Sequence, residues 1–221
     1  RGVRWDDGWK WASPIHEHLV RTFGARNMAV YRDDKNPWMV RHQHATKERV
    51  GNAFERNLRI TEKWFNEATD IKDKALAAYY LVRHTNQLGQ VEKSRELYRF
   101  VGDNLGRTNL TCESLCHWSR LESKLGNHEK AITIAGEAMT KAPELPEGLS
   151  AMGVAMALAG DYPRAAGVFD LLRSQAKPML ESQHDVVWLD GIVKVQMSKT
   201  FYKTGRLEDA QKSLDSIPQH L

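Results

Sequence analysis

The sequence has little of what would place the chain in several broad classes of protein. It contains two cysteines, Cys112 and Cys116, and two cysteines among 221 residues do not form a disulfide framework. Four residues apart on a helix, their side chains would point along the axis, where disulfide geometry is poor. We therefore expect both thiols to be reduced and buried as small hydrophobic side chains.

Long apolar runs and strong charge are also missing. No stretch approaches the roughly 18 apolar residues of a membrane-spanning helix, so the sequence predicts no transmembrane segment. The net charge is only +4, from 32 Lys and Arg against 28 Asp and Glu. Dedicated nucleic-acid-binding proteins usually carry a larger or more clustered basic excess. Charge therefore favours protein partners over RNA.

The short motifs of catalysis and cofactor binding are absent as well. The sequence has no Gly-x-Gly-x-x-Gly, no phosphate-binding Gly-x-x-x-x-Gly-Lys-Ser/Thr and no His-Glu-x-x-His. Two His-x-His pairs, His16 with His18 and His42 with His44, lack the cysteine or acidic spacing of a zinc site. We predict that the chain is not an enzyme and has no catalytic residues, metal ligands or cofactor.

What the sequence does have is an internal repeat. In four segments a glycine is followed five residues later by a small residue. The glycines are Gly89, Gly126, Gly160 and Gly205, and the small residues are Ser94, Ala131, Ala165 and Ala210. Glycine accepts a positive φ at a helix end, and a small residue lets paired helices approach closely. Each segment therefore predicts a turn between two packed helices.

The spacing and composition of these segments point to a known family. The glycines are 37, 34 and 45 residues apart, and the pattern is clearest from Cys112 to Lys177. The positions that carry it are Leu115, Trp118, Gly126, Ala131, Ala135, Ala138 and Pro143, then Leu149, Met152, Gly153, Gly160, Tyr162, Ala165, Phe169 and Leu172. They resemble the packing signature of the tetratricopeptide repeat, whose period is 34 residues. The pentatricopeptide repeat is a close rival, because Gly205 to Ala210 resembles its turn.

The resemblance implies an all-α fold, a right-handed α-solenoid of about four helix-turn-helix repeats in residues 75–221. Before it, residues 46–74 predict a packing helix, since apolar residues recur at helical spacing from Thr46 to Ala68. Residues 1–45 predict an irregular arm with one short helix. That helix would start at Ser13 and Pro14, which suit an N-cap and a first turn, and end at Gly24.

The arm is rich in tryptophan. Trp5, Trp9, Trp11 and Trp38 are four of the seven tryptophans in the chain. Each buries about 200 Å² at best, and exposed aromatic clusters favour association. Two interpretations remain open: the arm packs on its own solenoid, or it binds a neighbouring subunit. We predict these four residues as one of two partner-binding regions.

The resemblance places the second region on the concave surface formed by the first helix of each repeat. The matching positions are Tyr79, Arg83 and Asn86, then Glu113, Arg120 and Ser123, then Glu147 and Ser150, then Lys199 and Tyr202. Chaperone-binding members use a lysine and an asparagine to hold a terminal carboxylate, where this chain has Tyr79 and Arg83. The resemblance therefore disfavours chaperone tails as partners.

Together these features predict a non-catalytic scaffold whose partners are protein subunits of a larger assembly, with pentatricopeptide-like RNA binding as the alternative. Short repeat proteins with an N-terminal arm resemble accessory subunits of large mitochondrial complexes, such as ATP synthase, respiratory complexes or mitoribosomes. The pI near 9, the sparse cysteines and a first residue that is not Met favour the mitochondrial matrix after removal of a transit peptide. The cytoplasm is the alternative location.

Overall fold

The four predicted turns share one hydrogen-bond pattern. The structure, a computed structural model, describes residues 9–12, 18–21, 47–175 and 191–217. At each turn the glycine N–H donates to the carbonyl three residues earlier, and the next N–H donates to the carbonyl five residues before it. The four glycines have φ between +69° and +83°. This geometry closes one helix before the next begins, so the predicted turns are confirmed.

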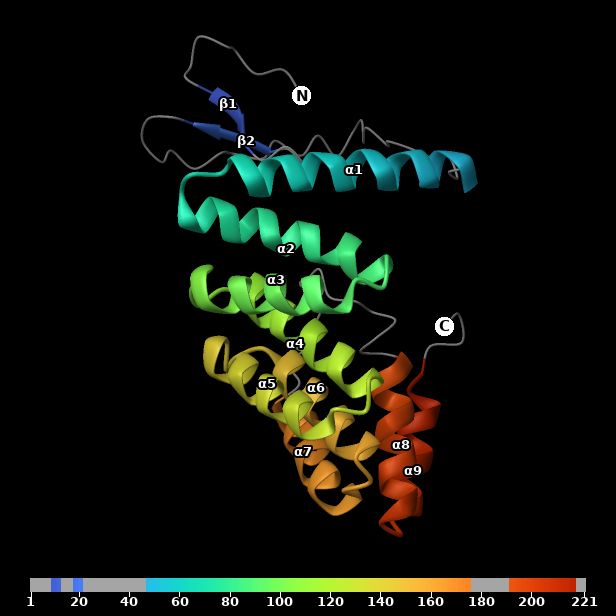
Figure 1. Cartoon of the computed structure of the whole chain (residues 1–221). Coiled ribbons are helices and arrows are strands. Elements are labelled where there is room, and N and C mark those ends of the chain that lie inside the picture. The colour runs from blue at the N-terminus through green and yellow to red at the C-terminus, as the bar shows by residue number, and fades with distance from the viewer. Residues whose placement is uncertain (1–8, 13–17, 22–46, 176–190, 218–221) are drawn as a thin grey trace, which may run out of the picture. The chain divides into compact units, whose positions relative to one another are not determined.

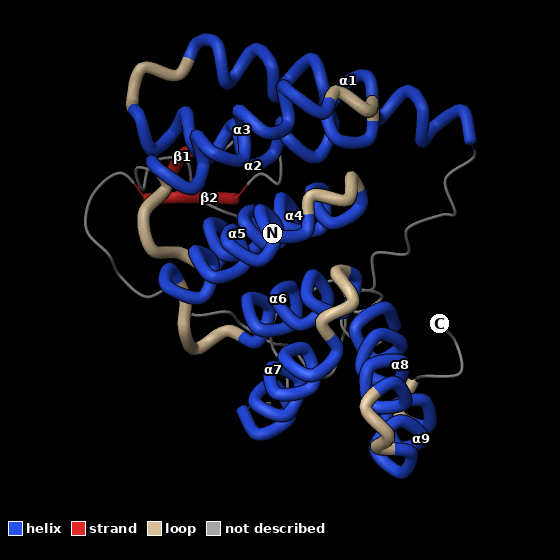
Figure 2. Tube along the Cα trace, turned by 60° about the horizontal axis from the view of Figure 1, so that its bottom comes forward, coloured by secondary structure: helices blue, strands red, loops and turns tan. Residues whose placement is uncertain are grey.

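Four helix pairs flank these turns (Figure 1). The first helices of the pairs are α2 (Ile71–Gln87), α4 (Asn109–Lys124), α6 (Pro146–Leu158) and α8 (Lys194–Lys203). The second helices are α3 (Val91–Asn104), α5 (His128–Lys141), α7 (Tyr162–Gln175) and α9 (Leu207–Asp215). Short loops join the paired helices (Figure 2). The predicted solenoid of four helix-turn-helix repeats is confirmed. By its internal contacts the chain divides into two compact units, Arg1–His84 and Thr85–Leu221.

Small residues let the helices of the second unit pack closely. Ser94, Ala131 and Ala165 are completely buried, and Ala210 is 6% exposed. The hydroxyl of Ser94 is satisfied, because it lies 2.9 Å from the Thr85 hydroxyl in a shared hydrogen bond. The repeated small position therefore packs as the sequence predicts.

The third and fourth repeats share one apolar core. The rings of Phe169 on α7 and Phe201 on α8 meet edge to face at 6.5 Å, and Leu149, Val193 and Met197 are buried with them. A glycine in α6 makes room for this core, since a β-carbon on Gly153 would lie 2.5 Å from the Phe169 ring. The fourth repeat is thus joined to the third by continuous hydrophobic packing.

The long helix predicted before the repeats is α1 (Lys47–Glu67). Within the first unit it packs on α2 through Trp64, whose ring stacks on Tyr80 with centroids 6.0 Å apart. The Trp64 indole N–H also donates to the carboxylate of Asp73 at 3.1 Å. At the other end of the pair, Phe54 meets the ring of His84 edge to face at 5.1 Å. Within the first unit, α1 therefore packs against α2 at both ends of the pair.

The short helix predicted in the arm is wrong where the structure describes it. β1 (Trp9–Ala12) and β2 (His18–Arg21) form an antiparallel pair in which Trp11 lies opposite Leu19. β2 falls in the middle of the predicted helix. A run this short carries too little periodicity to separate helix from strand, and pairing with β1 provides the backbone hydrogen bonds. The arm is therefore less irregular here than predicted.

Candidate functional site

Two of the three predicted partner-binding residues on α2, Tyr79 and Arg83, contact each other. Arg83 Nη2 donates to the Tyr79 hydroxyl at 2.8 Å, and the guanidinium lies over the Tyr79 ring, 5.0 Å from its centroid. Tyr79 is buried, whereas Arg83 and Asn86 are exposed. Tyr79 therefore positions Arg83 and offers little surface of its own to a partner.

Two of the residues predicted on α4 are linked by a third. Glu113 Oε1 lies 3.5 Å from His117 Nε2, and His117 Nδ1 lies 3.5 Å from an Arg120 guanidinium nitrogen. All three side chains are half-buried, while the predicted Ser123 is only 7% exposed. His117 was not predicted as a site residue, although its spacing from Glu113 is the i, i+4 spacing of helix neighbours.

On α6 the expected open groove is not present. Glu147 is 4% exposed and Ser150 is fully buried, with the Ser150 hydroxyl donating to the Glu147 carbonyl at 2.8 Å. The reason is close helix packing, because a β-carbon on Gly148 would lie 2.6 Å from the Met139 side chain of α5. Family register placed these two residues on a partner-facing surface, and the structure places them in the interior.

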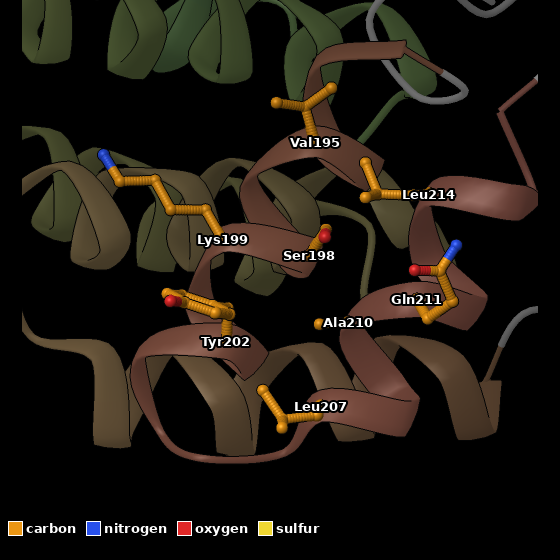
Figure 3. Close-up of a pocket in the computed structure, with 8 residues that line it drawn as sticks. All are labelled: Val195, Ser198, Lys199, Tyr202, Leu207, Ala210, Gln211 and Leu214. Carbon is orange, nitrogen blue, oxygen red and sulfur yellow. The ribbon is translucent and has the colours of Figure 1, made fainter.

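The fourth repeat carries an open hollow of about 510 Å³ between α8 and α9 (Figure 3). Val195, Lys199 and Tyr202 line it from α8. Leu207, Gln211 and Leu214 line it from α9. Lys199 and Tyr202 were both predicted as partner-binding residues, and the structure brings them together on one wall. Tyr202 is 63% exposed and Leu207 is 62% exposed, so the hollow offers apolar surface to solvent.

Ion pairs fix α9 against α7 and so hold the second wall of the hollow. Arg206 donates to both carboxylate oxygens of Asp170, at 2.7 and 2.9 Å, and its guanidinium lies 4.3 Å from the Phe201 ring centroid. Arg206 and Arg173 also donate to Asp209. Hydrogen bonds from Arg206 and then Arg173 lower the pKa of Asp209. The carboxylate therefore stays ionised in this cluster.

A buried carboxylate that was not predicted from the sequence joins α3, α4 and α5. Glu122 on α4 has no exposed surface and accepts hydrogen bonds from Arg95 at 2.7 Å, from Asn127 at 2.8 Å and from the Trp118 indole at 2.9 Å. Lys130 Nζ lies 2.8 Å away. Burial alone would raise the pKa of Glu122, but these donors together hold it well below the ordinary value of 4.5.

The surroundings of Glu122 give it a structural role. Its partners come from the second helix of the first repeat and from both helices of the second repeat, so the carboxylate ties two repeats together. Trp118 extends the tie, because its ring stacks on Tyr98 and lies 4.6 Å from the Arg99 guanidinium. The i, i+4 spacing of Trp118 and Glu122 was visible in the sequence, but the partner Arg95 is 27 residues away and was not.

The two cysteines are buried, as predicted, and neither is in a disulfide. Hydrogen bonding with Cys112, followed by burial, raises the pKa of the Cys116 thiol well above its ordinary value. A thiol in that state is a weak nucleophile. Within the described residues, no three His, Cys, Asp or Glu side chains are grouped closely enough to hold a metal ion.

The arm prediction is only partly covered by the structure. Trp9 and Trp11 belong to β1, where their backbone partners are Arg21 and Leu19. Trp5 and Trp38 lie outside the described residues.

Among the helices that the structure describes, none combines the length and apolar character that crossing a bilayer requires.

Comparison with known proteins gives structural matches only. No family model matches the chain, and neither does any curated protein sequence. Among solved structures, BtubC (BKLC) from P. vanneervenii aligns with a TM-score of 0.62 at 15% identity, over 76% of this chain and 73% of that one. MamA aligns with a TM-score of 0.56 at 13% identity, over 80% and 94% of the two chains.

A third match is YrrB, described as a TPR protein with an unusual peptide-binding site. It aligns with a TM-score of 0.50 at 16% identity, over 76% of this chain and 78% of that one. At these identities the likeness establishes the fold. This chain has the fold of a tetratricopeptide-type solenoid, as its four glycine turns indicate.

Proposed function

We propose that this chain is a non-catalytic scaffold that binds other proteins, and that it serves as an accessory structural subunit of a large mitochondrial complex such as ATP synthase, a respiratory complex or the mitoribosome. The observation that carries the scaffold proposal is the open hollow between α8 and α9, lined by Lys199 and Tyr202. A solenoid of this type that leaves large apolar side chains exposed offers surface for a protein partner. YrrB, to which the chain is similar in fold, is described as having an unusual peptide-binding site.

The charges of the predicted surface favour protein over RNA. Arg83, Arg120 and Lys199 provide positive charge, but Glu113 lies on the same helix as Arg120 and is linked to it through His117. A surface of mixed sign suits a protein with complementary charges better than a polyanion. The matrix location is supported by the sequence pI near 9 and by two buried, reduced cysteines.

Affinity capture from a lysate tests this function. The full chain carries a tag and is captured with and without nuclease, and the retained species are identified and sized on a density gradient. We expect a fixed set of mitochondrial proteins that co-sediments with the chain and resists nuclease. Loss of the complex on nuclease treatment would instead support the pentatricopeptide-like RNA-binding alternative.

Charge-reversal variants test the predicted surface, and a charge reversal outside that surface is the matched control. Glu113→Lys and Arg83→Glu are expected to remove captured proteins, whereas Glu144→Lys, at an exposed position before α6, is expected to retain them. If both surface variants retained every captured protein, these two residues would not be part of the binding surface.

A further inference from the structure

Contacts between consecutive repeats show which element covers the face that each helix pair turns toward the next repeat. The residue nine positions after the turn glycine contacts the first helix of the next repeat in two of them. Tyr98 on α3 stacks on Trp118 of α4 with centroids 6.4 Å apart, and Phe169 on α7 meets Phe201 of α8 at 6.5 Å. The residue six positions after the glycine behaves similarly, because Arg95 pairs with Glu122 of α4 at 2.7 Å. A following first helix is therefore the natural occupant of this face.

In the fourth repeat the same face is exposed. Leu214, nine positions after Gly205, is 47% exposed, whereas Tyr98, Ala135 and Phe169 at the equivalent positions are at most 2% exposed. Val195 on α8 and Leu207 on α9 are 46% and 62% exposed on the same hollow. Figure 3 shows these side chains along the two facing walls. No helix among the described residues covers them as α8 covers the third repeat.

Charge defines the occupant further. Of the side chains that line the hollow, only that of Lys199 is charged, and among the described residues the Lys199 ammonium group has no hydrogen-bond or ion-pair partner. Between the first and second repeats, a cation of one repeat pairs with a carboxylate on the next first helix, Arg95 with Glu122. A carboxylate on the occupant would complement Lys199 in the same way.

We propose that the α8/α9 hollow is the docking site for an amphipathic helix of another protein, which packs on this chain as the first helix of a following repeat would. Its apolar side chains follow the i, i+4, i+8 spacing of Val193, Met197 and Phe201, which bury α8 against the third repeat. A carboxylate beside that apolar stripe pairs with Lys199. This proposal rests on the scaffold function and assigns its partner a structural class.

A designed helical peptide serves as the probe. It consists of alanine and glutamine, with leucines at i, i+4 and i+8 and one glutamate beside them, and a second version carries lysine in place of the glutamate. Binding of the fluorescent peptides to the full chain is measured by anisotropy. We expect the glutamate peptide to bind, and Leu214→Asp to weaken it by about tenfold or more. Leu171→Asp is the control, because Leu171 on α7 is 44% exposed but lies outside the hollow.

Charge exchange tests the role of Lys199. Lys199→Glu is expected to weaken the glutamate peptide and to restore affinity for the lysine peptide. Equal binding by wild type, Leu214→Asp and Leu171→Asp, or no change of preference in Lys199→Glu, would overturn the proposal. A concentration-dependent dimer in sedimentation that Leu214→Asp abolishes would overturn it in favour of a second copy of the chain. The scaffold function fails separately, if the wild-type chain captures no protein from the lysate.

Discussion

The second and fourth repeats of this solenoid are built alike but are stabilised differently. In the second repeat, charge is buried: Glu122 has no exposed surface and is held by donors from three helices. At the fourth repeat, charge lies at the surface: Arg206 pairs with Asp170 of the third repeat, and their side chains remain 34% and 45% exposed. The second repeat is joined to its neighbour by buried polar groups, whereas the fourth is joined by partly solvated ones and leaves Val195, Leu207 and Leu214 about half exposed or more.

Removing the buried carboxylate should have the largest effect on stability. Glu122→Ala leaves Arg95, Lys130 and the Trp118 indole without their shared acceptor, so we expect the free energy of unfolding to fall by about 3–5 kcal/mol. Urea titration followed by circular dichroism measures this change. A loss below about 1 kcal/mol would show that water replaces the carboxylate and that the tie between the repeats is weak.

The contribution of Glu122 to the free energy of unfolding should change with pH in a defined direction. The pKa of Glu122 is lower in the folded chain than its ordinary value of 4.5, so its contribution is complete above that value and is lost as the pH falls below it. We expect wild type to exceed Glu122→Gln in stability at pH 7, by about 1.5–3 kcal/mol for charged hydrogen bonds, and the difference to shrink below pH 4.5. Urea midpoints of both proteins across this range provide the test, and a constant difference would contradict it.

Two helical glycines allow the effect of close packing on stability to be distinguished from the effect of helix propensity. In Gly153→Ala the new β-carbon meets the Phe169 ring, and overpacking of about 1–3 kcal/mol outweighs the gain of about 1 kcal/mol from replacing a helical glycine. In Gly167→Ala, on α7, the β-carbon meets nothing within 4 Å, so the same substitution should stabilise by about 0.5–1 kcal/mol. Thermal unfolding of both variants checks the opposite signs. Equal shifts would show that α6 and α7 are not tightly packed at Gly153.

Weakening the surface ion pair between Asp170 and Arg206 should have the smallest effect on the free energy of unfolding. Asp170→Asn weakens the bond to Arg206, but both side chains are partly solvated, so we expect a loss of at most about 1 kcal/mol that diminishes with added salt. Urea midpoints at low and high salt measure it. A loss as large as that of Glu122→Ala would remove the contrast between the inner and outer repeats.

The sequence predicted the features that local chemistry determines. A positive φ requires glycine, and a crowded helix contact requires a small residue, so Gly126 with Ala131 marks a repeat without knowledge of the rest of the chain. The helix α1 followed in the same way from apolar spacing. Predictions that depended on distant partners were less successful. Glu147 and Ser150 have the register of groove residues, but packing of α6 against α5 buries them.

In the candidate site, too, the residues set by local register were predicted and those set by contacts between helices were not. Lys199 and Tyr202 were predicted from register and do share a hollow, because both lie on α8 at adjacent turns. The opposite wall, with Leu207 and Leu214 from α9, depends on how two helices meet and was not predicted. The strand β2 was missed for a related reason, since four residues acquire a strand conformation only through pairing with β1.

The glycine turns have a consequence for how the array can be adjusted. A β-carbon added at Gly89, Gly126, Gly160 or Gly205 meets no atom within 4 Å, so alanine there would cost only the left-handed backbone conformation, about 1–2 kcal/mol. The four turns lie in different repeats and share no partners, so these costs should add. Alanine at successive turns should therefore lower the stability of the array in similar steps, while the side chains that line the α8/α9 hollow stay the same.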